Sequence, residues 1–290
     1  MAQDSSAQTT VENSTSFNAD DIQLLVLDID GTIAGESNQI RPAVLQAIRA
    51  AQAKGIQVAI ATGRMYQSAL RFHAAVGSTL PLMAYQGAMI KDPATEHLYR
   101  HWAISKFFAL KLLDHLEQPE LRSHISIHFY INDQLYVREI TPETKLYGER
   151  SHVTPIAVGD LRRSLDIEPT KILALSEDTD LIDHLLTSLR QLYTPAELYF
   201  TKSVATFFEA TNPQVNKGTA VRYLAEEMLG LRASQVMTIG DNFNDVEMLE
   251  YAGIGVAMGN APADVQAIAQ WTAPDVESDG VAVAIETFLL

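Results

Sequence analysis

Two acidic loops contain the residues in this sequence that are best suited to chemistry. Residues 28–32 read DIDGT and place Asp28 and Asp30 two positions apart, followed by a glycine. Residues 240–245 read GDNFND and supply Asp241 and Asp245. Carboxylates gathered at this density raise each other's pKa unless a cation lies among them. Ligands that are all oxygen suit Mg²⁺, which uses few carboxylates and keeps several waters. The two loops therefore predict a magnesium site with a nucleophile and a proton-transfer group in the first loop.

A second group of residues suits the binding of an anion. Thr62 and Gly63 place a hydroxyl and a glycine amide at the start of a predicted helix, which is a favourable corner for phosphate. Lys217 follows Asn216 at the head of another helix, where a cation opposes the helix dipole, so contact with an anion explains it better. Alone, an ordinary helix cap and a solvated lysine would explain these residues better than an anion site. An anion-binding role for these residues is favoured only in combination with the acidic loops.

Short apolar strands position these residues. The predicted strands span 22–27, 56–61, 82–85, 236–239 and 254–257. Helical patterns lie between them, from Pro42 to Gly55 and over 65–76, 217–229 and 245–251, and a last helix starts at Gly280. This alternation is typical of an α/β fold with a Rossmann-like, doubly wound parallel sheet, in which ligands collect outside the carboxyl ends of the strands.

The pattern changes between residues 88 and 210. Strand-like segments at 125–131 and 134–138 flank Asn132-Asp133, a hairpin turn signal. Further strands are predicted at 171–175, 198–201 and 205–209, and helices after Ser105 and Asp178. We therefore expect an α/β core domain at 17–87 and 211–290, split by an inserted α+β cap domain at 88–210. Residues 1–16, rich in Ser, Thr and Gln, are predicted to be a disordered tail.

The composition narrows the possible partners. The formal net charge of -15 argues against nucleic acid, whose phosphates repel an acidic surface. No apolar run approaches the ~18 residues that a membrane span needs. The absence of cysteine excludes thiolate catalysis and thiolate-bound zinc. The first sixteen residues lack the apolar segment of a signal peptide, so a cytoplasmic protein is expected. The oligomeric state stays open.

Taken together, the motifs resemble the haloacid dehalogenase superfamily of phosphatases. The resemblance is closest to the Cof-type branch (subfamily IIB), whose large C2-type α/β cap is inserted after the third core strand. It covers nearly the whole chain after residue 20 and includes 28–32, 62–64, Lys217, 240–245 and the stretch 255–261, GVAMGNA. The resemblance implies a Mg²⁺-dependent phosphatase of small phosphorylated metabolites, such as sugar phosphates or cofactor phosphates, that forms an aspartyl-phosphate intermediate.

The resemblance also implies a role for each matching residue. Asp28 would attack phosphorus and bind Mg²⁺. Asp30 would protonate the leaving oxygen, then activate water, and its backbone carbonyl would bind the metal. Asp241 would be the third ligand, and Asp245 would lie close to the metal without binding it directly. The groups expected to hold the phosphoryl oxygens are Thr62, the Gly63 amide, Lys217 and Asn244.

One position departs from this branch, and other classes of protein fit the sequence less well. Gln86 stands before Gly87 where the branch commonly has asparagine, which leaves open how the cap entrance meets the substrate.

The alternative function is a catalytically inactive phosphate-binding or regulatory protein of the same fold. It is disfavoured because every chemical position carries the expected residue. A signalling receiver domain fits less well, since its metal-binding acidic pair precedes the phosphorylated aspartate. The pair His124 and His128 is expected to be ordinary surface or core histidine.

Overall fold

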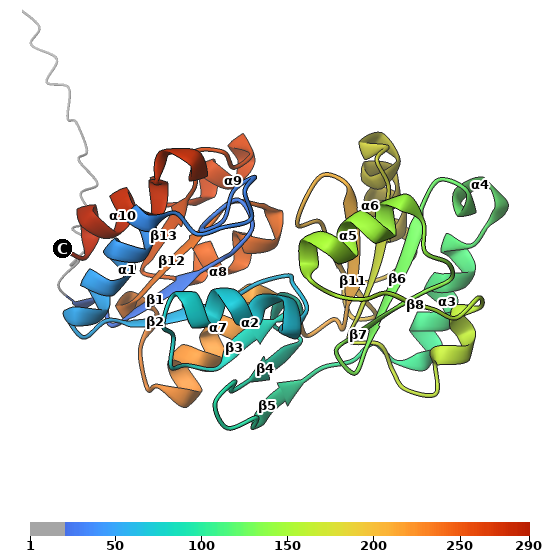
Figure 1. Ribbon diagram of the computed structural model, residues 1–290, viewed down its shortest axis with the longest axis horizontal. Helices are drawn as coiled ribbons and strands as arrows, with labels where there is room; N and C mark the ends of the chain where they lie inside the picture. Colours follow the sequence, from blue (N-terminus) through green and yellow to red (C-terminus); the bar gives the residue numbers. More distant parts are fainter. Residues whose placement is uncertain (1–20) are drawn as a thin grey trace, which may run out of the picture.

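The computed structural model describes residues 21–290, and these form two units side by side (Figure 1). One unit holds the two ends of the described chain, and the other is formed by the middle of it. The tail predicted for residues 1–16 lies outside the described residues. None of the helices that the structure describes is both long and apolar enough to cross a membrane.

The first unit is built on a five-stranded parallel sheet in the order β14-β13-β12-β1-β2. Its strands are β1 (Leu24–Leu27), β2 (Gln57–Ile60), β12 (Val236–Gly240), β13 (Ile254–Ala257) and β14 (Trp271–Thr272). Every residue of β1, β12 and β13 is buried. Such strands are covered on both faces, which is why they read as continuous apolar runs in the sequence.

Helices cover both faces of this sheet. Leu25 and Leu27 pack into one cluster with Ile48 of α1, whereas Leu24 and Val26 pack into another with Leu224. Alternate residues of one strand therefore serve opposite faces, as the two-residue period of a strand requires. The helices of this unit are α1 (Pro42–Ala53), α2 (Tyr66–Ala75), α7 (Lys217–Arg222), α8 (Val246–Tyr251), α9 (Ala263–Ile268) and α10 (Gly280–Phe288).

A small antiparallel sheet extends the first unit. β3 (Leu82–Ala84) is joined to the end of β2 by a parallel bridge between Ala61 and Met83. It pairs with β4 (Met89–Lys91), which pairs with β5 (Leu98–His101). Both β4 and β5 fall inside the range predicted for the cap, yet they pair with β3. The boundaries at 88 and 210 remain a prediction.

The second unit, called the inserted unit below, comprises residues 106–211. Its six-stranded sheet has the order β10-β11-β9-β6-β7-β8. The strands are β6 (Ser126–Ile131), β7 (Gln134–Val137), β8 (Ile156–Ala157), β9 (Lys171–Leu175), β10 (Tyr199–Thr201) and β11 (Phe207–Thr211). The helices are α3 (Lys106–Leu116), α4 (Pro119–Arg122), α5 (Pro142–Ser151) and α6 (Thr179–Leu192).

The two faces of this second sheet have different surroundings. Ile172 and Ala174 of β9 pack in one cluster with residues of α3 and α6. Lys171, Leu173 and Leu175 alternate with them and line a cavity between the two units. One face of the sheet is therefore the core of the inserted unit, and the other looks toward the first unit.

Several local predictions are confirmed. The turn residues Asn132 and Asp133 have φ values of 51° and 55°, as a tight hairpin between β6 and β7 requires. Ser105 and Asp178 cap α3 and α6 through their side chains. The helix predicted over 217–229 is α7 followed by a π-helical turn at Tyr223–Met228. The sequence pattern does not predict α4, α5, α9, β4, β5, β8 or β14.

Candidate active site

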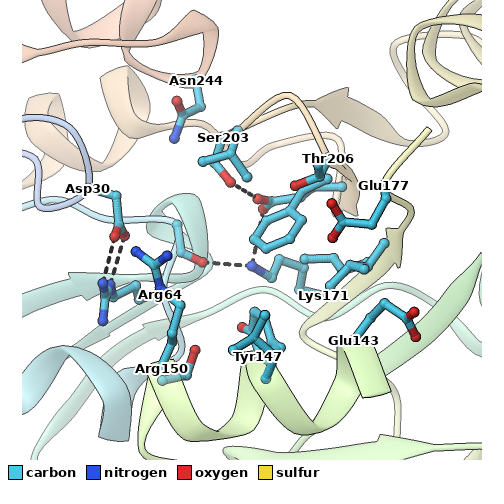
Figure 2. A pocket seen from close by; sticks show the side chains of 18 of the residues that line it. Asp30, Arg64, Glu143, Tyr147, Arg150, Lys171, Glu177, Ser203, Thr206 and Asn244 are labelled. Atoms are coloured by element: carbon cyan, nitrogen blue, oxygen red, sulfur yellow. Dashed lines mark hydrogen bonds and ion pairs between the residues drawn. The ribbon is translucent and has the colours of Figure 1, made fainter. Parts of the chain in front are cut away.

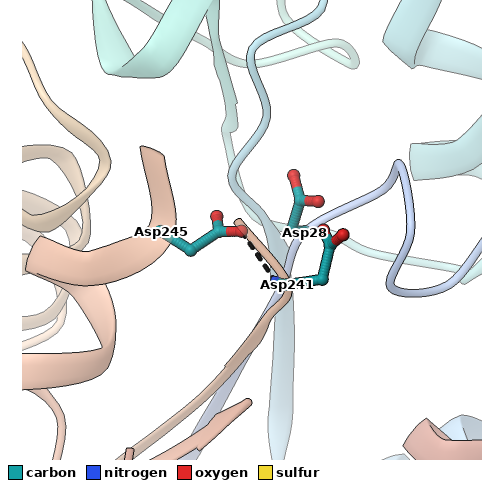
Figure 3. A group of neighbouring side chains, drawn as sticks. All are labelled: Asp28, Asp241 and Asp245. Carbon is teal, nitrogen blue, oxygen red and sulfur yellow. Dashed lines mark hydrogen bonds between the residues drawn. The ribbon is translucent and has the colours of Figure 1, made fainter. Parts of the chain in front are cut away.

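Asp28 and Asp241 meet because their strands are neighbours. β1 and β12 run parallel with Leu27 opposite Ile239, so the residues that follow them emerge at the same edge of the sheet. Asp245 joins them from the loop that begins at Asp241, and Figure 3 shows the three side chains grouped together. Carboxylate oxygens of Asp28, Asp241 and Asp245 all lie within 4.8 Å of one another, and all three residues are buried. The structure thus brings together the two acidic loops singled out in the sequence.

A buried lysine lies within this cluster. Lys217 Nζ, 0% exposed, donates to Asp28 Oδ1 and to Asp245 Oδ1, each at 2.5 Å. Burial raises the pKa of Asp28 to about 7, with Lys217 acting against the rise and Asp245 adding to it. Burial lowers the pKa of Lys217, but Asp245 and Asp28 outweigh burial and the net shift is upward. The lysine is therefore held in its charged form.

The second acidic loop is held by its own hydrogen bonds. Asp245 Oδ2 accepts from the backbone amides of Asp241 and Asn242 at 2.9 and 3.0 Å. Asp241 Oδ2 accepts from Asn260 Nδ2 at 3.2 Å, and burial together with Asp28 raises the pKa of Asp241 well above its usual range. Gly31 has a φ of 78°, and a Cβ there would lie 2.1 Å from Asp241 Oδ2. Only glycine fits against this carboxylate.

These residues fit a hard divalent cation. Three buried carboxylates face one ammonium group, so the cluster has an excess of negative charge that costs free energy unless a cation offsets it. The donors are all oxygen, as Mg²⁺ prefers. Asp245 has both oxygens engaged, by Lys217 and by backbone amides, whereas Asp28 and Asp241 are the carboxylates suited to direct binding.

Asp30 is held away from this cluster by an arginine. Arg64 Nε donates to Asp30 Oδ2 at 2.7 Å and Arg64 Nη2 to Asp30 Oδ1 at 2.5 Å, a bidentate pair (Figure 2). Arg64 Nη2 also donates to Asn38 Oδ1 at 2.8 Å. Burial lowers the pKa of Arg64, but its hydrogen bonds to Asp30 and the negative charge of Asp30 outweigh burial, and the net shift is upward. The contact fixes both side chains at the mouth of the acidic cluster.

The predicted phosphate corner is only partly open to a ligand. Thr62 is 1% exposed, and its Oγ1 accepts from the Arg64 amide at 3.1 Å. Gly63 lines the cavity, and its carbonyl oxygen accepts from Lys171 Nζ at 2.7 Å. Asn244 also lines the cavity and donates from Nδ2 to Gln86 Oε1 at 3.1 Å. The structure therefore places Gly63 and Asn244 beside the cavity, with Thr62 behind them.

A cavity of about 300 Å³ lies between the two units, with Asp28 and Asp30 among its lining. The inserted unit contributes Lys171 and Glu177 and one face of α5, formed by Glu143, Leu146, Tyr147 and Arg150 (Figure 2). These α5 residues follow the spacing of three and four that shares a helix face. Within the part of the chain that the structure describes, the side chains of Glu143, Glu177 and Arg150 have no hydrogen-bond or ion-pair partner.

Some site residues escaped the sequence reasoning. Asn260 lies three residues after the end of β13, inside the stretch 255–261 that carries the family resemblance, but nothing local pointed to its contact with Asp241. Arg64 stood within a motif that was noticed, but its partner Asp30 is 34 positions away. Lys171 and Glu209 lie on strands of the inserted unit and carried no local signal.

The sequence matches the haloacid dehalogenase-like hydrolases over residues 25–285. The chain belongs to this family. The resemblance drawn from the sequence motifs and the predicted fold class are thereby confirmed. Members of this family typically use a metal, and the buried acidic cluster of this hydrolase could hold one.

Three similar proteins illustrate the relationship. A Bacillus subtilis protein named 5-amino-6-(5-phospho-D-ribitylamino)uracil phosphatase YcsE is 30% identical over 274 residues, covering 93% of this chain and 97% of the relative. A haloacid dehalogenase-like hydrolase structure from B. subtilis has a TM-score of 0.81 at 25% identity, covering 92% of this chain and all of the other (100%). The subclass IIB sugar phosphatase BT4131 has a TM-score of 0.76 at 22% identity, with 92% and 98% covered, and supports the fold. This haloacid dehalogenase-like hydrolase is therefore an enzyme whose fold and site are in keeping with hydrolysis of phosphoric monoesters.

Proposed function

We propose that this hydrolase is a Mg²⁺-dependent phosphatase that acts on small phosphorylated metabolites through an aspartyl phosphate on Asp28. The observation that carries the proposal is the convergence of Asp241 and Lys217 on Asp28, which lines the cavity. The name of the relative YcsE, a phosphatase of a phosphorylated uracil derivative, supports the same class of reaction.

Asp28 is the nucleophile in this proposal. Its attack forms a bond from carboxylate oxygen to phosphorus and releases the alcohol, and water then hydrolyses the acyl phosphate. A carboxylate nucleophile divides one difficult displacement into two easier steps. Lys217 keeps a positive charge beside Asp28 and stabilises the charge on the phosphoryl oxygens. Asp28, Asp241 and the Asp30 carbonyl would hold Mg²⁺, which would supply further positive charge to those oxygens.

Asp30 is the proposed acid and base. It protonates the leaving oxygen in the first step and takes a proton from water in the second. In the structure both of its carboxylate oxygens accept hydrogen bonds from Arg64. To act as an acid, Asp30 must therefore exchange Arg64 for the leaving oxygen when the substrate is bound. The Gly63 amide, Asn244 and Thr62 are proposed to hold the phosphoryl group.

The inserted unit is proposed to select the leaving group. The core residues contact only the phosphoryl group and the metal, so they cannot distinguish one alcohol from another. The cavity-facing side of α5 offers a guanidinium at Arg150 and a carboxylate at Glu143, beside Tyr147, and neither charged group has a partner among residues 21–290. Such a lining suits a leaving group rich in hydroxyl groups, as in a sugar phosphate or a cofactor phosphate.

The test is hydrolysis of p-nitrophenyl phosphate by the purified full-length chain. We expect activity in Mg²⁺ that is abolished by EDTA and restored by excess Mg²⁺. Asp28→Asn keeps the shape of the side chain but removes the nucleophile, so activity should fall by several orders of magnitude. Asp166→Asn changes an exposed aspartate of the inserted unit and is the matched control. Comparable turnover by Asp28→Asn and the control would refute the assignment.

A further inference from the structure

A chain of buried contacts joins the inserted unit to Asn244 in the second acidic loop. Lys171 and Glu209, which are 2% and 1% exposed, form an ion pair of 3.1 Å between β9 and β11. Glu209 Oε2 also accepts from Gln86 Nε2 at 3.0 Å. Gln86 Oε1 in turn accepts from Asn244 Nδ2 at 3.1 Å. The chain of contacts therefore begins at a charged pair and ends at a neutral amide.

The charge on Glu209 sets the direction of both amides. An ionised carboxylate can only accept hydrogen bonds, so Gln86 must turn its NH₂ group toward Glu209 and its oxygen toward Asn244. Asn244 must then meet that oxygen with its own NH₂ group. Turning over either amide alone would place two acceptors or two donors face to face, and turning over both would set the Gln86 oxygen against the carboxylate. The charged carboxylate of Glu209 therefore allows only one orientation of the Gln86 and Asn244 amides.

Asn244 consequently meets the cavity in a single orientation. The residue is 4% exposed and lines the cavity beside the reacting groups. Its Oδ1 is buried and has no hydrogen-bond partner among the described residues. One of the two N–H groups of Nδ2 also has no partner there, because only the other donates to Gln86. A ligand that contacts Asn244 from the cavity therefore meets its amide in one fixed orientation.

Gln86 is held in a shape that serves both contacts. Its φ of 61° lies in the left-handed region, which is unfavourable for a residue with a side chain and persists only where surrounding contacts maintain it. A Cβ on Gly63 would lie 2.4 Å from Gln86 Nε2, so the absence of a side chain at Gly63 makes room for this amide. The extra methylene of glutamine, compared with asparagine, lets one side chain contact both Glu209 and Asn244.

We propose that Lys171, Glu209 and Gln86 are positioning residues that orient the Asn244 amide for binding the phosphorylated substrate. This inference rests on the proposed phosphatase function. Lys171 and Glu209 belong to the inserted unit, whereas Gln86 and Asn244 belong to the first unit. The orientation of Asn244 is therefore fixed only while the two units are in the contact seen here.

The experiment breaks the chain of contacts at two places. It then tests whether the resulting loss of kcat/KM depends on the presence of Asn244. Gln86→Met removes both hydrogen bonds but leaves the ion pair, and the double variant Lys171→Met/Glu209→Gln removes the charge without leaving a buried ion unpaired. Each should lower kcat/KM about tenfold to a hundredfold, the range expected for a hydrogen bond to a charged group. In an Asn244→Ala background the same changes should lower it by less than about twofold.

The control removes a pair of the same charges elsewhere in the inserted unit. Lys202 and Asp183 form an ion pair that does not contact Gln86 or Asn244. Lys202→Met/Asp183→Asn should leave kcat/KM within about twofold of the wild type. Equal losses from Gln86→Met in the wild-type and Asn244→Ala backgrounds would overturn the proposal, because the effect would then not pass through Asn244.

A readout without turnover separates this inference from the proposed function. In ¹⁵N–¹H spectra of the full chain, the Asn244 side-chain NH₂ protons should exchange slowly with solvent in the wild type. They should lose that protection in Gln86→Met and in Lys171→Met/Glu209→Gln. Unchanged protection in both variants would refute the positioning role whether or not the enzyme is active. Absence of Mg²⁺-dependent phosphatase activity in the wild type would refute only the proposed function.

Discussion

Replacing Lys217 by Met should destabilise the protein severely. The Lys217 ammonium is fully buried and contacts Asp28 and Asp245 at 2.5 Å each. At an effective dielectric constant of ~20, each contact is worth about 7 kcal/mol of Coulomb energy. Dehydration costs several kcal/mol per ion, so the net loss on breaking such a buried arrangement is about 3–5 kcal/mol. The carboxylates left behind would also repel one another.

The assay is urea unfolding at pH 7.5 in EDTA and again in excess Mg²⁺. In EDTA, Lys217→Met should lose about 3–5 kcal/mol of unfolding free energy. Adding Asp245→Asn should recover more than half of that loss, since the double variant removes a buried negative charge along with the positive one. Mg²⁺ should stabilise the wild type by about 2.7 kcal/mol when its concentration is ~100 times the dissociation constant.

The control for this series is Lys202→Met, which breaks a partly exposed ion pair with Asp183. Its cost should stay below about 1 kcal/mol. A loss below 1 kcal/mol for Lys217→Met in EDTA, equal to that of the control, would refute the argument that the lysine balances the carboxylate cluster.

Three further predictions concern the reaction, acid stability and specificity. Asp30→Asn should lower kcat by ~10²–10⁴ on alkyl phosphates and by less on p-nitrophenyl phosphate, whose leaving group needs no protonation; equal losses on both would exclude the acid role. Burial lowers the pKa of His128 to about 3, so the unfolded chain binds a proton below about pH 6.5 while the fold does not, and stability is lost as the pH falls from there. Relative to His128→Gln, the wild type should lose about 2 kcal/mol of unfolding free energy between pH 7 and pH 5. Urea unfolding of both proteins at the two pH values measures this, and an equal loss in both would contradict the prediction. Arg150→Met should change kcat/KM at least tenfold on the best natural substrate but less than about twofold on p-nitrophenyl phosphate; proportional losses on both would place specificity elsewhere.

The catalytic half of the molecule could be predicted because its signals are local. The core strands are buried on both faces, so they read as unbroken apolar runs, and each ends at a polar loop that needs no tertiary information to notice. Asp28 and Asp241 stand out in this way, Lys217 stands out as a cation at the head of a helix, and the structure brings the three together. Neighbouring parallel strands carry their following residues to the same edge, which turns separate motifs into one site.

The cavity-facing parts of the inserted unit gave no such signal. The face of α5 that lines the cavity carries Glu143, Leu146, Tyr147 and Arg150, so its pattern is not that of a helix covering an apolar core. Lys171 sits at the start of β9 and pairs with Glu209, 38 positions away. Only the three-dimensional alternation of Lys171, Leu173 and Leu175 toward the cavity reveals this face. Residues of this kind serve contacts with a ligand or with a residue far away in the sequence. Local periodicity reports only which side chains share a face of an element, so it does not reveal these contacts.

The balance of charge around the cavity links metal binding to phosphate binding. The carboxylates of the site and cavity are Asp28, Asp30, Glu143, Glu177, Glu209, Asp241 and Asp245. They outnumber the cations, which are Arg64, Arg150, Lys171 and Lys217.

Pairing decides which of these charges a substrate can use. Arg64 is occupied by Asp30, Lys171 by Glu209, and Lys217 by Asp28 and Asp245. Among the cations just named, only Arg150 has a side chain without a partner in the part of the chain that the structure describes. A phosphate monoester would therefore enter a site with more negative than positive charge, in a protein whose formal net charge is already -15. A divalent cation between Asp28 and Asp241 would offset that repulsion and free part of the charge of Lys217 for the phosphoryl oxygens. The same buried carboxylates that make the empty cluster unfavourable thus make anion binding depend on the metal.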